Sequence, residues 1–149
     1  MIIINYNFDK RAKELFKSVD VDIKKIENFS SFIINEYKNT RKVWVYDLSV
    51  KTDSNCSGGS YFFGENKIEI GTKLSKRSKK NKRKWTIGTY FHELCHFIQD
   101  NIDNISERKI AYSDKDVEEC NDTYYNNVYE IQARKFEDKY SKIYLELFH

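Results

Sequence analysis

Apolar residues in the N-terminal part of the chain recur at intervals of three or four positions, which is the spacing of one face of an α-helix. Asp9 precedes the first such stretch, and Asp20 or Asp22 precedes the second. Short acidic side chains are preferred at helix N-caps because they accept hydrogen bonds from the free amide groups of the first turn. We therefore expect two helices that cover a sheet. Their apolar faces consist of Ala12, Leu15, Phe16 and Val19, and of Ile23, Ile26, Phe29, Ile33 and Tyr37.

An extended pattern follows between residues 42 and 70. Residues 42–48 are rich in β-branched and aromatic side chains, and residues 60–63 and 67–70 flank the turn sequence Gly-Glu-Asn. Both features are typical of strands and hairpins. In the second arm Ile68 and Ile70 alternate with charged residues, as expected for a strand with one solvated face. These segments predict a small, mostly antiparallel sheet of about three strands.

Two longer helices complete the expected fold. A helical pattern without proline runs from Trp85 to Ile102, and a second one runs from about Asp122 to Leu147. The order of helices, then strands, then helices predicts an α+β fold. The 149 residues are enough for one domain, 1–149, with a substantial core.

The composition indicates a cytoplasmic protein. No apolar run reaches the length of a membrane span, so we expect no membrane partner, and residues 1–4 are too short for the apolar core of a signal peptide. The three cysteines are Cys56, Cys95 and Cys120, an odd number without CxxC spacing, and we expect them to be reduced thiols.

Residues 92–96 read His-Glu-Leu-Cys-His, an HExxH motif inside the first of the two longer helices. Residues four apart lie one above the other on a helix, so His92 and His96 can bind one metal ion while Glu93 projects beside them. At about 100° per residue, both histidines flank the apolar stripe of the helix and do not lie within it. The helix can therefore bury its apolar side and turn the motif toward a cleft. The pattern predicts a zinc site.

A catalytic zinc ion normally has three protein ligands and an open position for water. The remaining histidine, His149, is the final residue and is poorly placed to be a ligand. The extended HExxHxxGxxH form is absent because Gln99 and Ile102 occupy the positions of its glycine and last histidine. The third ligand should therefore be a carboxylate. Glu130 flanks the apolar stripe of its helix at nearly the same offset as His92 flanks its own, so Glu130 is the expected ligand.

Other interpretations of the same carboxylates stay open at this point. Glu130 can instead form a solvated ion pair with Arg134, one turn along the helix. Glu137 lies on the same edge of the helix and is the next candidate ligand, followed by Glu118 and Glu119.

Residues 89–99 (TYFHELCHFIQ), followed some thirty residues later by residues 127–134 (NVYEIQAR), resemble the small gluzincin metallopeptidases, which include the ImmA/IrrE-like proteins and related phage-encoded domains. The resemblance covers the hairpin and the last two helices and implies a zincin-like minimal metalloprotease fold. It also implies that Glu130 is the third zinc ligand. In this group an exposed strand before the motif helix binds substrate as an added strand. That strand corresponds to residues 61–70 here, with Ile68, Glu69 and Ile70 as the substrate-binding residues.

The expected activity is hydrolysis of peptide bonds in a peptide or protein substrate. Zn²⁺ lowers the pKa of a bound water and polarises the scissile carbonyl, while Glu93 takes the water proton and passes it to the leaving amine. An oxyanion stabiliser is also expected. Tyr124, Tyr125 and Arg134 are candidates, and the sequence does not select one of them.

The positive charge of the chain is concentrated in one segment. Residues 73–84 contain eight lysines or arginines and no acid, so the rest of the chain is net acidic although the total is +3. Such a segment can bind nucleic acid, or it can be a solvated loop. A nucleic-acid-associated protein is therefore the alternative function, and a catalytically inert zinc-binding module is a third. The sequence does not indicate an oligomeric state.

Overall fold

A four-stranded mixed sheet in the strand order β1-β2-β4-β3 forms the centre of the fold. The computed structural model describes residues 1–73, 79–105 and 122–148. In chain order the elements are β1 (Ile2–Phe8), α1 (Lys10–Ser18), α2 (Ile23–Tyr37), β2 (Trp44–Asp53), β3 (Gly59–Phe62), β4 (Lys67–Gly71), α3 (Lys79–Asn101), α5 (Asp122–Tyr125) and α6 (Val128–Phe148). The predicted α+β class is confirmed.

Both N-terminal helices begin at a short acidic residue. The Asp9 carboxylate accepts a hydrogen bond from the amide of Ala12 at 2.8 Å, and the Asp22 carboxylate accepts one from the amide of Lys25 at 3.0 Å. Asp20 lies between the two helices with a φ of 58°, in the left-handed region, so it does not cap α2. The prediction of two capped helices is confirmed, with Asp22 as the second cap.

The prediction of about three mostly antiparallel strands is wrong. β1 pairs in parallel with β2, β2 pairs in parallel with β4, and only β3 with β4 is antiparallel. The missing strand is β1, in which Ile2, Ile4 and Phe8 are buried and alternate with solvent-facing residues. α1 and α2 connect β1 to β2, and a crossover of this kind returns the chain to a parallel neighbour.

The position of β4 also corrects the expectation for substrate binding. β4 pairs with β2 on one side and with β3 on the other, so the backbone of Ile68, Glu69 and Ile70 does not form a free edge. The side chains of Ile68 and Ile70 are fully buried in the core. β3 is the edge strand of the hairpin, and strand addition beside the motif helix would have to take place there.

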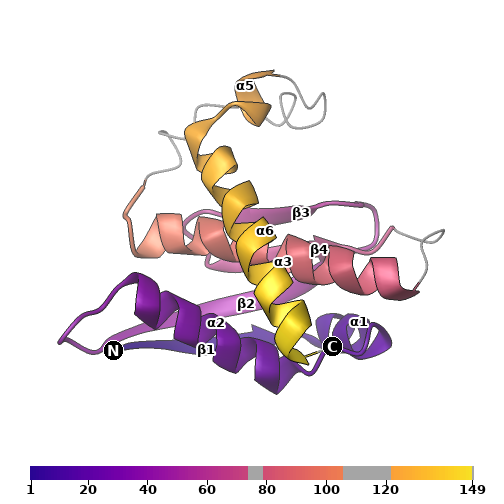
Figure 1. The fold of residues 1–149 in the computed structure, drawn as a ribbon, viewed down its shortest axis with the longest axis horizontal. Helices are drawn as coiled ribbons and strands as arrows, with labels where there is room; N and C mark the ends of the chain where they lie inside the picture. Colours follow the sequence, from indigo (N-terminus) through magenta and orange to yellow (C-terminus); the bar gives the residue numbers. More distant parts are fainter. Residues whose placement is uncertain (74–78, 106–121, 149) are drawn as a thin grey trace.

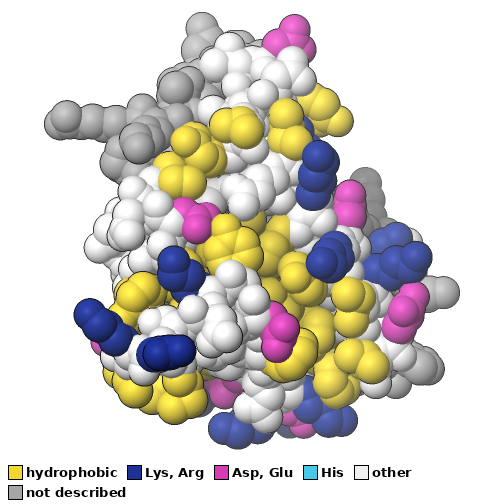
Figure 2. Space-filling view, turned by 60° about the vertical axis from the view of Figure 1, so that its left-hand side comes forward, with side chains coloured by type: hydrophobic (Ala, Val, Ile, Leu, Met, Phe, Trp, Pro, Cys, Tyr) yellow, Lys and Arg dark blue, Asp and Glu magenta, His cyan; other side chains and the backbone are white. Residues whose placement is uncertain are grey.

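α1, α2 and α3 cover one face of the sheet, and α6 crosses over α3 as an outer layer (Figure 1). The core lies between the sheet and this helical layer. It includes Leu48, Ile68 and Ile70 from the sheet and Phe91, Leu94 and Ile98 from α3. Figure 2 shows one face of the molecule, where exposed hydrophobic side chains lie among scattered charged ones and no described histidine is visible. Among the described residues, no helix combines the length and the apolar character needed to cross a membrane.

The edge strand β3 is attached to α3 at both of its ends. At one end the Tyr61 hydroxyl donates to the Asp100 carboxylate at 2.7 Å, and the Gly64 amide donates to the same oxygen at 2.9 Å. At the other end Gly59 lies so close to α3 that a Cβ there would be 2.4 Å from Cγ2 of Thr89 and 3.1 Å from Oε1 of Glu93. The absence of a side chain at Gly59 therefore allows the start of β3 to lie against the motif helix.

We predict that Gly59→Ala lowers the free energy of unfolding by about 1–3 kcal/mol, because the added methyl group overpacks the contact between β3 and α3. Gly58→Ala is the matched control, since a Cβ at Gly58 meets no atom within 4 Å. Urea unfolding of the two variants measures the difference. Equal stabilities for the two variants would contradict the close approach at Gly59.

Candidate metal centre

The structure brings His92 and His96 of α3 together with Glu130 in the first turn of α6. One potential ligand atom from each of the three side chains lies within 4.8 Å of the others. His96 is 4% exposed and Glu130 is 1% exposed. Glu130 is therefore not the solvated surface carboxylate that the ion-pair interpretation requires. Two imidazoles and one carboxylate are a donor set that zinc accepts in catalytic sites.

The Glu130 carboxylate bridges the two imidazole rings. Its Oε1 atom lies 2.8 Å from Nε2 of His96, and its Oε2 atom lies 2.9 Å from Nε2 of His92. The same ring nitrogen of each histidine therefore faces the carboxylate. A metal ion held by this group would bind those two Nε2 atoms and a Glu130 oxygen.

Glu137, the alternative ligand, lies on the other side of His92. Its Oε1 atom is 3.0 Å from Nδ1 of His92, so it contacts the ring nitrogen that does not face Glu130. A carboxylate in this position accepts the Nδ1 proton and leaves the Nε2 lone pair for a metal. The structure thus gives Glu137 an orienting contact with a potential metal ligand, His92. Glu118 and Glu119 lie outside the described residues.

Opposite charges determine the protonation of this cluster in the absence of a metal. Burial acts to lower the pKa of His92, but the hydrogen bonds to Glu130 and Glu137 outweigh it and raise the pKa to about 10. For Glu130 burial acts to raise the pKa, yet the hydrogen bonds from both histidines hold it well below its usual range. At neutral pH the metal-free cluster therefore contains an ionised Glu130 and a protonated His92.

Glu93 lies beside the three-residue group and is not a member of it. Its side chain is buried, and this burial raises the pKa of the carboxyl group. A carboxyl group with a raised pKa is a more effective proton acceptor near neutral pH than an ordinary glutamate. The start of β3 passes directly over it at Gly59. Glu93 therefore lies where the start of β3 meets α3, beside the two histidines of the three-residue group.

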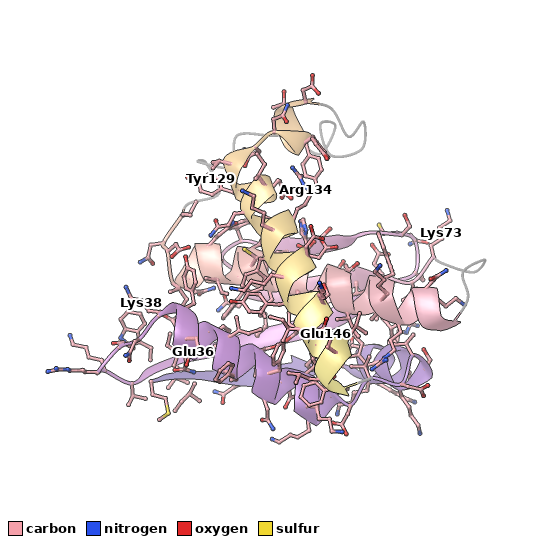
Figure 3. All side chains as sticks on the ribbon, in the orientation of Figure 1. Glu36, Lys38, Lys73, Tyr129, Arg134 and Glu146 are labelled. Carbon is pink, nitrogen blue, oxygen red and sulfur yellow. The ribbon has the colours of Figure 1, made fainter. Side chains whose placement is uncertain are left out.

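Among the three candidates for an oxyanion stabiliser, Tyr124 is the one that reaches the cluster. Burial and the negative charges of Glu130 and Glu93 raise the pKa of Tyr124, and its hydroxyl donates a hydrogen bond to Glu130. Tyr125 is exposed, and the guanidinium of Arg134 lies 4.1 Å from the centre of its ring. Arg134 also donates to the backbone carbonyl of Tyr125, which attaches α5 to α6. Figure 3 shows Arg134 near the start of α6, close to α5.

A groove of about 970 Å³ lies between α3 and α6, and its lining includes Glu137, the residue that contacts Nδ1 of His92. Gly88 and Glu137 lie at the end nearest the histidines, and Trp85 and Leu145 lie further along. A Cβ on Gly88 would be 3.1 Å from Oε2 of Glu137, so the glycine makes room for that carboxylate. The groove has the size of a typical ligand pocket.

Comparisons with protein families, with curated proteins and with solved structures find no match for this chain. Sequence reasoning identified the three clustered residues and Glu93. It missed the orienting contacts made by Glu137 and by Gln99, because each depends on which helix faces the histidine and not on a motif.

We predict that the protein binds one zinc ion per chain and that Glu130→Gln weakens zinc binding by at least about 100-fold, because a neutral amide replaces an anionic ligand. Asp138→Asn is the matched control, an exposed carboxylate on the same helix. Competition with a chromophoric chelator measures both affinities. Similar losses in the two variants would remove Glu130 from the ligand set.

Zinc binding should also release protons. The raised pKa of His92 means that Nε2 is protonated below about pH 10, and a metal must displace that proton. Proton release at about pH 8 should therefore be close to one per zinc or greater, and it should decrease as the pH rises through about 10. Titration calorimetry in buffers of different ionisation enthalpy measures this number. A binding enthalpy that is independent of the buffer would contradict the protonated metal-free site.

Proposed function

We propose that the protein is a zinc-dependent peptidase of the gluzincin type, with a zincin-like fold. The observation that carries this proposal is the convergence of His92, His96 and Glu130 beside a buried Glu93. A metal-binding group and a proton acceptor on adjacent positions are the minimum needed for metal-assisted hydrolysis. The resemblance of residues 89–99 and 127–134 to the motifs of that group is in keeping with it.

His92 and His96 would hold the zinc ion through Nε2, and Glu130 would hold it through a carboxylate oxygen. When bound, zinc supplies Lewis-acid chemistry, which activates a water molecule and polarises a peptide carbonyl. Glu93 accepts the proton of the attacking water and donates it to the leaving amine. The Tyr124 hydroxyl, which lies against Glu130, donates a hydrogen bond to the negative charge that develops on the carbonyl oxygen.

The substrate in this proposal is an extended segment of a peptide or protein. It would pair with the free edge of β3, because β3 pairs only with β4 among the described strands and its first residue, Gly59, lies over Glu93. This location replaces the expected role of Ile68, Glu69 and Ile70. The groove beside Gly88 and Glu137 offers space for the side chains of a substrate that passes the histidines.

The two alternative functions lead to different experimental results. Most of the basic segment, residues 74–78 and the side chains of Lys79 and Lys80, lies outside the described part of the structure. Of the described cations, Arg83 donates to the carbonyl of Phe148 and Lys84 lines the groove. Nucleic-acid binding through this segment would not depend on zinc. An inert module would bind zinc and leave peptides intact.

We predict that Glu93→Gln retains stoichiometric zinc but loses at least about 10²-fold in peptide hydrolysis, because the amide cannot accept the proton of the attacking water. Glu36→Gln, at an exposed position on α2, is the control. Cleavage of a mixture of quenched fluorescent peptides measures the activity. Zinc-loaded wild-type protein that cleaves none of them, nor a denatured protein substrate, would support the inert module.

A further inference from the structure

The side chain of Gln99 is completely buried between α3 and α6, one turn after His96. Its Oε1 atom lies 2.7 Å from Nδ1 of His96. Its Nε2 atom donates to the backbone carbonyl of Tyr129 at 3.1 Å and to Oε1 of Gln132 at 2.9 Å. A buried amide is tolerated when its donors and acceptor are paired, and these three contacts pair both ends of the Gln99 side chain.

The contact with Tyr129 determines which way the Gln99 amide points. A backbone carbonyl can only accept hydrogen bonds, so the NH₂ group of Gln99 must face α6 and its oxygen must face His96. That oxygen can only accept, so the proton of His96 must be on Nδ1. Nε2 lies 2.8 Å from Glu130 and donates to it in the metal-free cluster; when a metal displaces that proton, the neutral imidazole has its lone pair on Nε2. The hydrogen bonds of Gln99 to Tyr129 and to His96 thus select the tautomer of His96 that can bind a metal.

We propose that Gln99 is a positioning residue that fixes the tautomer and ring orientation of His96 for metal binding. This inference rests on the proposed metal site. Gln99 contacts Nδ1 of His96, the ring nitrogen that does not face Glu130, and it binds the backbone of the residue that immediately precedes Glu130. One side chain therefore connects His96 on α3 to the residue beside Glu130 on α6.

A carboxylate, Glu137, orients His92, whereas a neutral amide, Gln99, orients His96. The different burial of these two side chains accounts for the difference in charge. The side chain of Glu137 is 34% exposed, so a carboxylate can orient His92 while it remains partly hydrated. Gln99 has no exposure and faces a carbonyl and a second amide. An ionised carboxylate in that position would lose its hydration and face two other oxygens, which makes a neutral amide the better fit.

The test uses the full chain and measures zinc affinity by competition with a chromophoric chelator. Gln99→Leu has a similar volume but cannot accept the Nδ1 proton, and we expect zinc binding to weaken about 10- to 100-fold. Gln99→Glu keeps an acceptor for that proton. It should hold zinc within a few-fold of the wild type even if its folded state is less stable. The visible absorption of bound Co²⁺ should change in Gln99→Leu and be retained in Gln99→Glu.

Ser30→Ala is the control for a purely structural effect. Ser30 is also completely buried and hydrogen-bonds to the Tyr90 hydroxyl at 2.8 Å, so its loss lowers stability without touching the histidines. Its zinc affinity should stay at the wild-type level. Zinc affinities of Gln99→Leu and Gln99→Glu that are equally weakened, or both unchanged, would overturn the positioning role. Because the measurement is metal binding, a lack of peptidase activity does not affect it, whereas wild-type protein that binds no zinc would overturn both proposals.

Discussion

The carboxylate of Glu130 joins the two helices that carry the candidate site, and the other polar contacts depend on that junction. It accepts from both imidazoles, at 2.8 and 2.9 Å, while being almost completely buried. A buried carboxylate is costly unless its charge is compensated. The compensating imidazoles are on α3 and the carboxylate is on α6. The charge of Glu130 is therefore compensated only when the two helices cross as they do here. Apolar packing, such as that of Phe91 against Tyr144, favours contact between the helices, and the polar cluster specifies their register.

The parts of the fold that could be predicted are those whose cause is local. Asp9 and Asp22 cap helices because the amides they accept from are three residues away. His92 and His96 share a face because they are four residues apart on one helix. Glu130 was found by a longer argument, in which its offset from an apolar stripe matched that of His92. It meets the histidines because α6 crosses α3 with these faces in contact.

The parts that could not be predicted depend on contacts between distant segments. β1 has a clear alternation of buried and exposed residues, but its parallel pairing with β2 follows from a crossover of two helices. The alternation in residues 67–70 predicted one buried face correctly. It contained no information about how many strands flank β4. The alternation of side chains shows which face of a strand is buried, whereas neighbouring strands pair with its backbone along its two edges. Gln99 likewise looks like an ordinary polar helix residue until the helix opposite it is known.

If the candidate site binds a metal ion, the attachment of α6 to α3 through these residues would couple the stability of α6 to the supply of that ion. A ligand that binds only the folded state adds about 2.7 kcal/mol to its stability at a free concentration of 100 times the dissociation constant. Glu130 and both histidines are spread over the two helices, so for a zinc ion held there this stabilisation would act on their association. In zinc-poor surroundings α6 would separate from α3 more often and expose its backbone to proteolysis. The lifetime of the protein would then depend on the concentration of free zinc.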